Sequence, residues 1–260
     1  MGRTDFFAKF SFFPLSGTVG CDLYGGKRYF GTYAPPLDVV NGYEGVVDIF
    51  DPAEREYTVN MPLYSMVEKL YIGIKEGSVL KAAPDYAVMK PIVYYGSSIT
   101  HGGCATRPGC NYENTIGRSL DCDYINLGFA GCAKAEEEIA RYIAGLSMTA
   151  FVYDYDHNAP TVEYYRQTHE RMFKIIREAQ PDLPIIMMSR PKFYLSPEER
   201  ERVNIMLQTY ENALAAGDRN VYCIKGCDLL SEDIRENALV DNCHPTDGGF
   251  ASIAKVLEAK

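Results

Sequence analysis

The fold is decided by residues 91–103, which read PIVYYGSSITHGG. An apolar run ends at Gly96, and two serines, Ser97 and Ser98, follow directly. The carboxyl ends of parallel strands border the crevice in which α/β proteins bind ligands, and glycine lets the backbone bend sharply there. The stretch therefore predicts a buried strand that delivers the hydroxyl of Ser98 to a binding crevice.

Length and charge limit the classes of protein that the chain can belong to. Its 260 residues, 47% of them apolar, suffice for one large domain or two unequal ones. The 26 basic and 35 acidic side chains give a net charge of −9, so we expect no nucleic-acid partner. No apolar run reaches about 18 residues and no leader pattern opens the chain, so we expect no membrane span and a cytoplasmic protein. A strand that starts almost at once, at residues 6–13, would also fit a fragment of a longer chain.

The eight cysteines show no Cys-x-x-Cys spacing. This absence speaks against a zinc ribbon, and we expect no metal site and reduced thiols. A disulfide between Cys104 and Cys110 fits the geometry of their loop, but reduced thiols are the favoured interpretation there too.

Residues 1–88 have the pattern of a β-rich front domain. Short runs rich in Phe, Tyr and Val are separated by turn signals, and Gly25-Gly26 has the form of a two-residue hairpin turn. We therefore predict a small antiparallel sheet or β-sandwich-like domain. Its candidate strands are 6–13, 19–24, 27–34, 45–50, 55–60 and 67–74.

Residues 89–260 alternate apolar runs with segments of helical period, after a hinge at 81–90. The runs carry no polar alternation, which favours strands buried on both faces of a parallel sheet that helices cover. We therefore predict an α/β domain here. The five predicted strands are Ile92–Tyr95, Tyr124–Leu127, Ala150–Tyr153, Ile185–Met188 and Val221–Ile224.

Candidate catalytic residues follow successive predicted strands or lie in the loop before the last helix. A serine nucleophile needs a base, an orienting group for that base, and donors for the developing oxyanion. Ser98 follows the first strand of the α/β part, Gly131 the second and Asn158 the third, while Asp241 and His244 share the loop before the last helix. The pattern predicts that these groups converge on one crevice.

The blocks Gly96-Ser97-Ser98-Ile99-Thr100, Gly131, Asn158 and Asp241-x-x-His244 resemble, in order, the motif blocks of the SGNH (GDSL-type) hydrolases. Gly20-Cys21-Asp22-Leu23-Tyr24 is similar to the Gly-x-Asp-Leu-Tyr signature of the β-rich domain in one acyl-esterase branch of that family. The resemblance covers about residues 19–258.

This resemblance implies a flavodoxin-like, three-layer parallel sheet and a set of site residues. Ser98 would be the nucleophile, His244 the base and Asp241 its orienting group. The N–H groups of Ser98 and Gly131 and the amide of Asn158 would form the oxyanion hole. No metal or organic cofactor is expected.

The sequence departs from the family pattern at three places, one of which is Gly131, followed by Cys132-Ala133 where many members have a polar residue. Ser97 stands where the family name reflects an aspartate, which raises the question of what supports the turn. Asn158 is preceded by His157 and followed by Ala159, so the usual Gly-x-Asn-Asp form is absent.

Several residues have a competing interpretation. His101 is a rival base, Asn158 could instead cap the helix that begins near Thr161, and His169 falls on the apolar face of its helix. His157 and Arg107 are candidates for contact with substrate, although Arg107 fits a solvated loop equally well.

The resemblance favours a serine esterase that hydrolyses short-chain esters, especially acetyl groups on carbohydrates. An acyltransferase that uses the same serine and a non-catalytic carbohydrate-binding module are the alternatives. The expected partner is a small-molecule or carbohydrate ester, and the sequence leaves the oligomeric state open.

Overall fold

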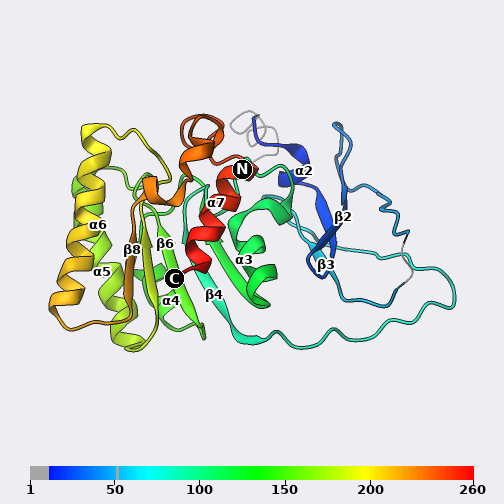
Figure 1. Cartoon of the computed structure of the whole chain (residues 1–260), viewed down its shortest axis with the longest axis horizontal. Helices are drawn as coiled ribbons and strands as arrows, with labels where there is room; N and C mark the ends of the chain where they lie inside the picture. Colours follow the sequence, from blue (N-terminus) through cyan, green and yellow to red (C-terminus); the bar gives the residue numbers. More distant parts are fainter. Residues whose placement is uncertain (1–11, 51–52) are drawn as a thin grey trace.

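The computed structural model describes residues 12–50 and 53–260 and contains two sheets (Figure 1). The larger sheet has five parallel strands in the order β5-β4-β6-β7-β8. All five predicted apolar runs form strands, and the order is that of a flavodoxin-like sheet, which confirms the expected fold class. The strands are β4 (Val88–Gly96), β5 (Cys122–Gly128), β6 (Ala150–Asp154), β7 (Ile185–Met188) and β8 (Val221–Ile224).

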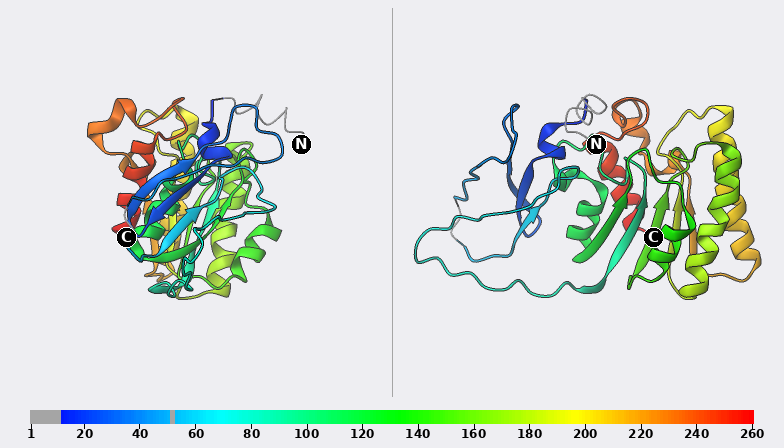
Figure 2. Two further views of the ribbon diagram at one scale, coloured as in Figure 1. Left: turned by 90° about the vertical axis from the view of Figure 1, so that its right-hand side faces the viewer. Right: turned by 180° about the vertical axis from the view of Figure 1, so that it is seen from behind.

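Helices cover both faces of this sheet and complete the three layers (Figure 1 and Figure 2). Alternate residues of one strand serve opposite cores: Val93 of β4 packs in the core with α4, α5 and α6, and Tyr94 in the core with α3 and α7. The long helices are α3 (Tyr112–Leu120), α4 (Glu137–Ala144), α5 (Val162–Ala179), α6 (Pro197–Ala215) and α7 (Asp247–Glu258). Short 3₁₀ helices are η1 (Pro108–Cys110), η2 (Gly226–Leu229) and η3 (Glu232–Asn237).

The helix starts follow from their capping residues. Ser196 and Glu199 form a reciprocal capping box at the start of α6. The hydroxyl of Thr246 accepts a hydrogen bond from the amide of Gly249 and so caps α7. This cap fixes the point at which the preceding loop, which holds Asp241 and His244, must end.

The front of the chain forms one antiparallel sheet in the order β2-β1-β3. Gly25 pairs with Arg28, so the hairpin turn consists of Gly26 and Lys27, one residue later than predicted. Gly26 has a φ of 56°, a conformation that glycine adopts without strain. The elements are α2 (Leu15–Thr18), which the sequence did not indicate, β1 (Cys21–Gly25), β2 (Arg28–Tyr33) and β3 (Tyr57–Asn60).

Two predicted front strands, 45–50 and 67–74, are wrong. The chain between β3 and β4 runs as a long loop away from the sheets (Figure 1), and Tyr71 and Ile72 are 84% and 68% exposed. Their composition suits a strand, but a strand forms only where a neighbouring strand supplies hydrogen bonds. Among residues 12–50 and 53–88 there is thus a single sheet without the second layer of a sandwich. Most of the predicted strand 6–13 lies outside the described residues.

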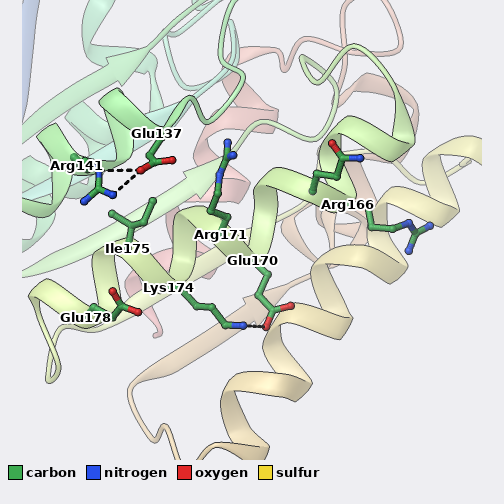
Figure 3. A pocket seen from close by; sticks show the side chains of 9 residues that line it. Glu137, Arg141, Arg166, Glu170, Arg171, Lys174, Ile175 and Glu178 are labelled. Atoms are coloured by element: carbon green, nitrogen blue, oxygen red, sulfur yellow. Dashed lines mark hydrogen bonds and ion pairs between the residues drawn. The ribbon is translucent and has the colours of Figure 1, made fainter.

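A hollow of about 470 Å³ lies over α4 and α5 (Figure 3). Charged side chains line it, and several of them pair: Arg141 with Glu137 at 2.5 Å and Lys174 with Glu170 at 2.8 Å. None of the residues that the sequence singled out borders this hollow, so it is not the predicted crevice. No helix in the described part of the chain is both long and apolar enough to cross a membrane.

Candidate active site

The nucleophile turn begins at Gly96, where β4 packs directly against Asp154 at the end of β6. A Cβ at position 96 would overlap the carboxylate of Asp154 and the hydroxyl of Thr100, so only glycine fits. The Thr100 hydroxyl donates to Asp154. Burial, opposed by this hydrogen bond, raises the pKa of Asp154 to about 8. The carboxyl group beneath the turn is therefore largely protonated at neutral pH.

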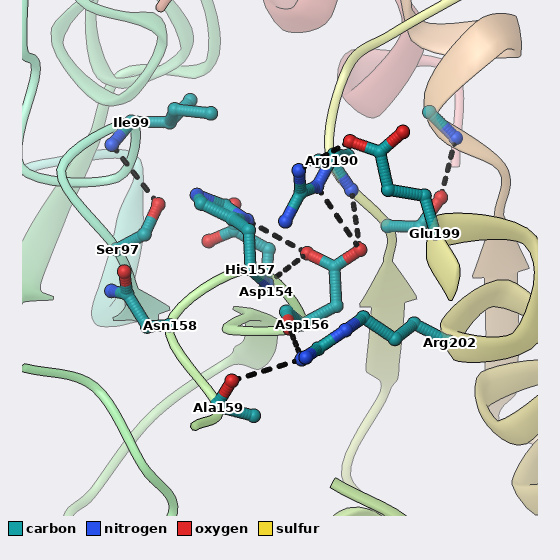
Figure 4. A network of polar contacts seen from close by, with 12 residues as sticks. Ser97, Ile99, Asp154, Asp156, His157, Asn158, Ala159, Arg190, Glu199 and Arg202 are labelled. Carbon is teal, nitrogen blue, oxygen red and sulfur yellow. Dashed lines mark hydrogen bonds and ion pairs between the residues drawn. The ribbon is translucent and has the colours of Figure 1, made fainter. Parts of the chain in front are cut away.

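Ser97 supports this turn in place of the family aspartate. Its side chain is fully buried, and its hydroxyl accepts a hydrogen bond of 3.1 Å from the amide of Ile99 (Figure 4). Such a local side-chain bond to the backbone closes a tight turn. The departure from the family pattern thus preserves the conformation that presents Ser98.

Ser98, His244 and Asp241 form a continuous chain of hydrogen bonds. Ser98 Oγ lies 2.8 Å from His244 Nε2, and His244 Nδ1 lies 2.9 Å from Asp241 Oδ2. The other oxygen of Asp241 accepts the amide N–H of His244 at 2.7 Å. Burial opposes ionisation of Asp241, but the bonds from His244 outweigh it and lower the pKa of this carboxyl. A carboxylate at Nδ1 leaves Nε2 free to accept the hydroxyl proton of Ser98.

The predicted oxyanion donors lie in the loops after β4, β5 and β6, which are neighbours in the sheet. Gly131 has a φ of 71° in the turn after β5. The amide of Asn158 donates to the carbonyl of Phe129 at 3.3 Å and so joins the two outer loops. Within the described residues, the N–H groups of Ser98 and Gly131 donate to no protein acceptor. Thr161 caps α5, so Asn158 is not needed for that purpose.

The competing histidines lie in packed surroundings. His101 stacks on Tyr64 with ring centroids 3.9 Å apart, and burial lowers its pKa to about 4. His169 is fully buried in α5 and bonds Thr209 at 2.8 Å, as its position on the apolar face predicted. The geometry therefore favours His244 as the partner of Ser98.

Arg107, a candidate substrate contact, lies against the front sheet. Its guanidinium donates to Asp22 at 2.8 Å and to the Tyr24 hydroxyl at 2.5 Å, and it lies 3.9 Å over the ring of Tyr29. Asp22 also accepts the amide of Gly109 at 2.9 Å. The Gly-x-Asp-Leu-Tyr motif thus ties the loop after the nucleophile to the front of the chain.

The front of the chain also supplies aromatic side chains beside His244, which the sequence analysis missed. The rings of Phe13 and Phe12 lie 5.1 and 5.7 Å from the imidazole, centroid to centroid. The Tyr64 hydroxyl donates to the carbonyl of Ser98 at 3.2 Å. No motif marks these residues, because only long-range packing brings them to the crevice.

A second polar cluster surrounds Asp156 (Figure 4), and of its members only His157 was a candidate from the sequence. His157 bonds Asp156 at 2.7 Å, Arg190 bonds it through the backbone at 3.2 Å, and Arg202 donates to its carbonyl group. The adjacent Asp156 and His157 were the available sequence signal. No group of three or more His, Cys, Asp or Glu side chains within residues 12–50 and 53–260 is arranged to hold a metal ion. All eight cysteines are free thiols, Cys104 and Cys110 included.

Residues 89–260 match the GDSL-like Lipase/Acylhydrolase family, and the chain belongs to it. It is therefore a hydrolytic enzyme of the esterase type. A search of curated proteins finds no match.

Solved structures with the same fold include three informative ones. A protein described as a GDSL-like lipase of Bacteroides ovatus ATCC 8483 is 27% identical, with a TM-score of 0.82 over 94% of this chain and 74% of that one. Salicylyl-acyltransferase SsfX3 from a tetracycline biosynthetic pathway is 17% identical, with a TM-score of 0.70 over 91% and 71%. A family two carbohydrate esterase from Clostridium thermocellum, solved in complex with cellohexaose, is 14% identical, with a TM-score of 0.66 over 95% and 86%.

Proposed function

We propose that the protein is a serine acyl-esterase that works through an acyl-serine intermediate at Ser98. The observation that carries this proposal is the bonded series Ser98–His244–Asp241, at 2.8 and 2.9 Å. His244 is the base and Asp241 holds its ring in the orientation and tautomer that expose Nε2 to the hydroxyl.

The groups support a two-step reaction. Nε2 of His244 takes the proton of Ser98 as Oγ attacks the ester carbonyl carbon. The oxyanion accepts hydrogen bonds from the N–H groups of Ser98 and Gly131 and from the Asn158 amide. His244 then passes its proton to the leaving alcohol, and the same imidazole activates the water that releases the acid from Ser98.

The preferred substrates are short-chain esters, especially acetyl groups on carbohydrates. The similarity of the fold to a family two carbohydrate esterase supports this choice. Phe12 also supports this choice of substrate. The residue is 47% exposed beside His244, and its ring offers an apolar surface to a bound sugar.

Release of acetate from 4-nitrophenyl acetate tests the proposal. Ser98→Ala and His244→Ala should each lower kcat/KM by roughly 10³-fold or more, because the two groups act as one unit. Ser119→Ala, an exposed serine of α3, is the matched control and should retain wild-type activity. Retention of activity by either active-site variant would show that the assignment is wrong.

Transfer of the acyl group to an alcohol is a second candidate, favoured by the structural similarity to a salicylyl-acyltransferase. Product analysis with a competing alcohol separates the two, since a transferase forms new ester even at low alcohol concentration. The third interpretation, a non-catalytic carbohydrate-binding module, loses its support because the chain belongs to an enzyme family.

A further inference from the structure

His157 has an imidazole whose hydrogen-bonding state is fixed by its neighbour. Its side chain is 6% exposed and lies one residue before Asn158. Asp156 Oδ1 accepts both the backbone N–H of His157 at 2.8 Å and its ring Nδ1 at 2.7 Å. Because a carboxylate can only accept, the ring proton lies on Nδ1. In the neutral ring, Nε2 is therefore a hydrogen-bond acceptor.

The cluster around Asp156 maintains this state. Burial opposes ionisation of Asp156, but the bond from His157 and the charge of Arg190 outweigh it and lower the pKa of the carboxyl. Burial also lowers the pKa of His157. Arg202 donates to the carbonyl groups of Asp156 and, at 3.0 Å, of Ala159, which fixes the loop (Figure 4). The result is a neutral imidazole that is rigidly oriented.

Nε2 of His157 is buried and has no hydrogen-bond partner among the described residues. A desolvated acceptor without a donor is unfavourable, and such atoms in native proteins call for a specific explanation. The ring edge that carries Nε2 points away from Asp156, toward the side on which Ser97 and Asn158 lie (Figure 4). Binding of a donor from that side would satisfy it.

The position of His157 relative to the reaction indicates which part of the ester would supply the donor. His157 stands in the loop after β6, next to Asn158, whose amide donates to the carbonyl of Phe129 at 3.3 Å in the loop that holds Gly131. Its ring therefore lies at the carboxyl end of the sheet, where β4 presents Ser98. In the proposed reaction His244 protonates the leaving alcohol. The alcohol part of the substrate therefore lies beside His244, at the end of the sheet where the loop after β6 carries His157 and Asn158.

We propose that Nε2 of His157 accepts a hydrogen bond from a hydroxyl group on the alcohol part of the ester. The site thereby selects esters of polyhydroxylated alcohols, such as sugars, over esters of simple alcohols. This inference rests on the proposed hydrolysis at Ser98 and adds a residue that determines its substrate class.

The test compares two acetylated methyl glycosides. One has a free hydroxyl next to the acetyl ester, and in the other a hydrogen replaces that hydroxyl. The readout is the ratio of kcat/KM for the first substrate to kcat/KM for the second. His157→Asn retains an amide near the Nδ1 position for Asp156 but loses the acceptor, whereas His157→Gln places an amide oxygen near the Nε2 position.

We expect the wild-type enzyme to favour the hydroxyl-bearing substrate by roughly 10-fold or more, a ratio that His157→Asn should reduce to near one. His157→Gln should restore part of it. An equal fall for both substrates in His157→Asn, or a wild-type ratio near one, would overturn the inference. Acetate release by Ser98→Ala would instead contradict the proposed function, so the two failures are distinguishable.

Discussion

Replacement of Arg107 by methionine tests how the front of the chain is joined to the loop after the nucleophile. The carboxylate of Asp22 is completely buried and accepts hydrogen bonds from Arg107 at 2.8 Å, Gly109 at 2.9 Å and Asn60 at 2.7 Å. Methionine keeps much of the aliphatic length but leaves this charge without its cation. Breaking a buried pair costs about 3–5 kcal/mol. Because the Arg107 side chain is 22% exposed, solvent reduces the loss, and we expect about 3 kcal/mol.

Urea unfolding followed by circular dichroism measures this loss. A fall of about 3 kcal/mol in the free energy of unfolding corresponds to a roughly 100-fold larger unfolded fraction. Arg107→Met combined with Asp22→Asn should recover part of the stability, because no charge remains buried. Arg219→Met, at an exposed position, is the matched control. An unchanged free energy of unfolding with a raised KM for acetyl esters would refute the reasoning and restore Arg107 as a substrate contact.

Further predictions concern the groups around the nucleophile. Asp241→Asn should lower kcat/KM by roughly 10²–10⁴-fold, since the carboxylate no longer fixes the tautomer of His244, and wild-type kinetics would contradict this role. Ser97→Ala should lower the free energy of unfolding by about 1–3 kcal/mol in urea titrations, because the buried amide of Ile99 loses its acceptor; an unchanged midpoint would count against it. The pKa of Asp154 is raised to about 8 in the folded chain, against about 3.9 in the unfolded chain. Between these two pH values the folded state therefore binds more protons than the unfolded state. Stability should therefore fall as pH rises from about 4 to about 8, and Asp154→Asn should flatten this decline; an equally steep decline in the variant would exclude Asp154 as its cause.

The sequence predicted the α/β part well because its signal is local. Strands buried on both faces are continuous apolar runs, and all five of these runs form strands. The front was predicted less well, since the strand-favouring composition of residues 67–74 says nothing about whether a partner strand lies beside them. The Gly25-Gly26 turn was misplaced by one residue for the same reason, because pairing between Gly25 and Arg28 decides the register.

The candidate site likewise contains residues that could be predicted from the sequence and residues that could not. Ser98 and His244 are 146 residues apart, but each stands in a recognisable motif. Both could therefore be predicted as catalytic candidates from the sequence. The bond between Arg107 and Asp22 could not be predicted, because Asp22 lies 85 residues earlier and no local pattern links the two residues. Phe13, Arg190 and Arg202 could not be predicted, because tertiary packing alone brings Phe13 to His244 and the two arginines to Asp156.

Covalent labelling with a fluorophosphonate probe, followed by intact-mass and peptide mass spectrometry, tests the central claim most directly. The claim is that His244 activates Ser98 as the nucleophile. We predict a single adduct on the wild-type chain that maps to Ser98, much slower labelling of His244→Ala, and none of Ser98→Ala. An adduct on another residue, or undiminished labelling of Ser98→Ala, would contradict it.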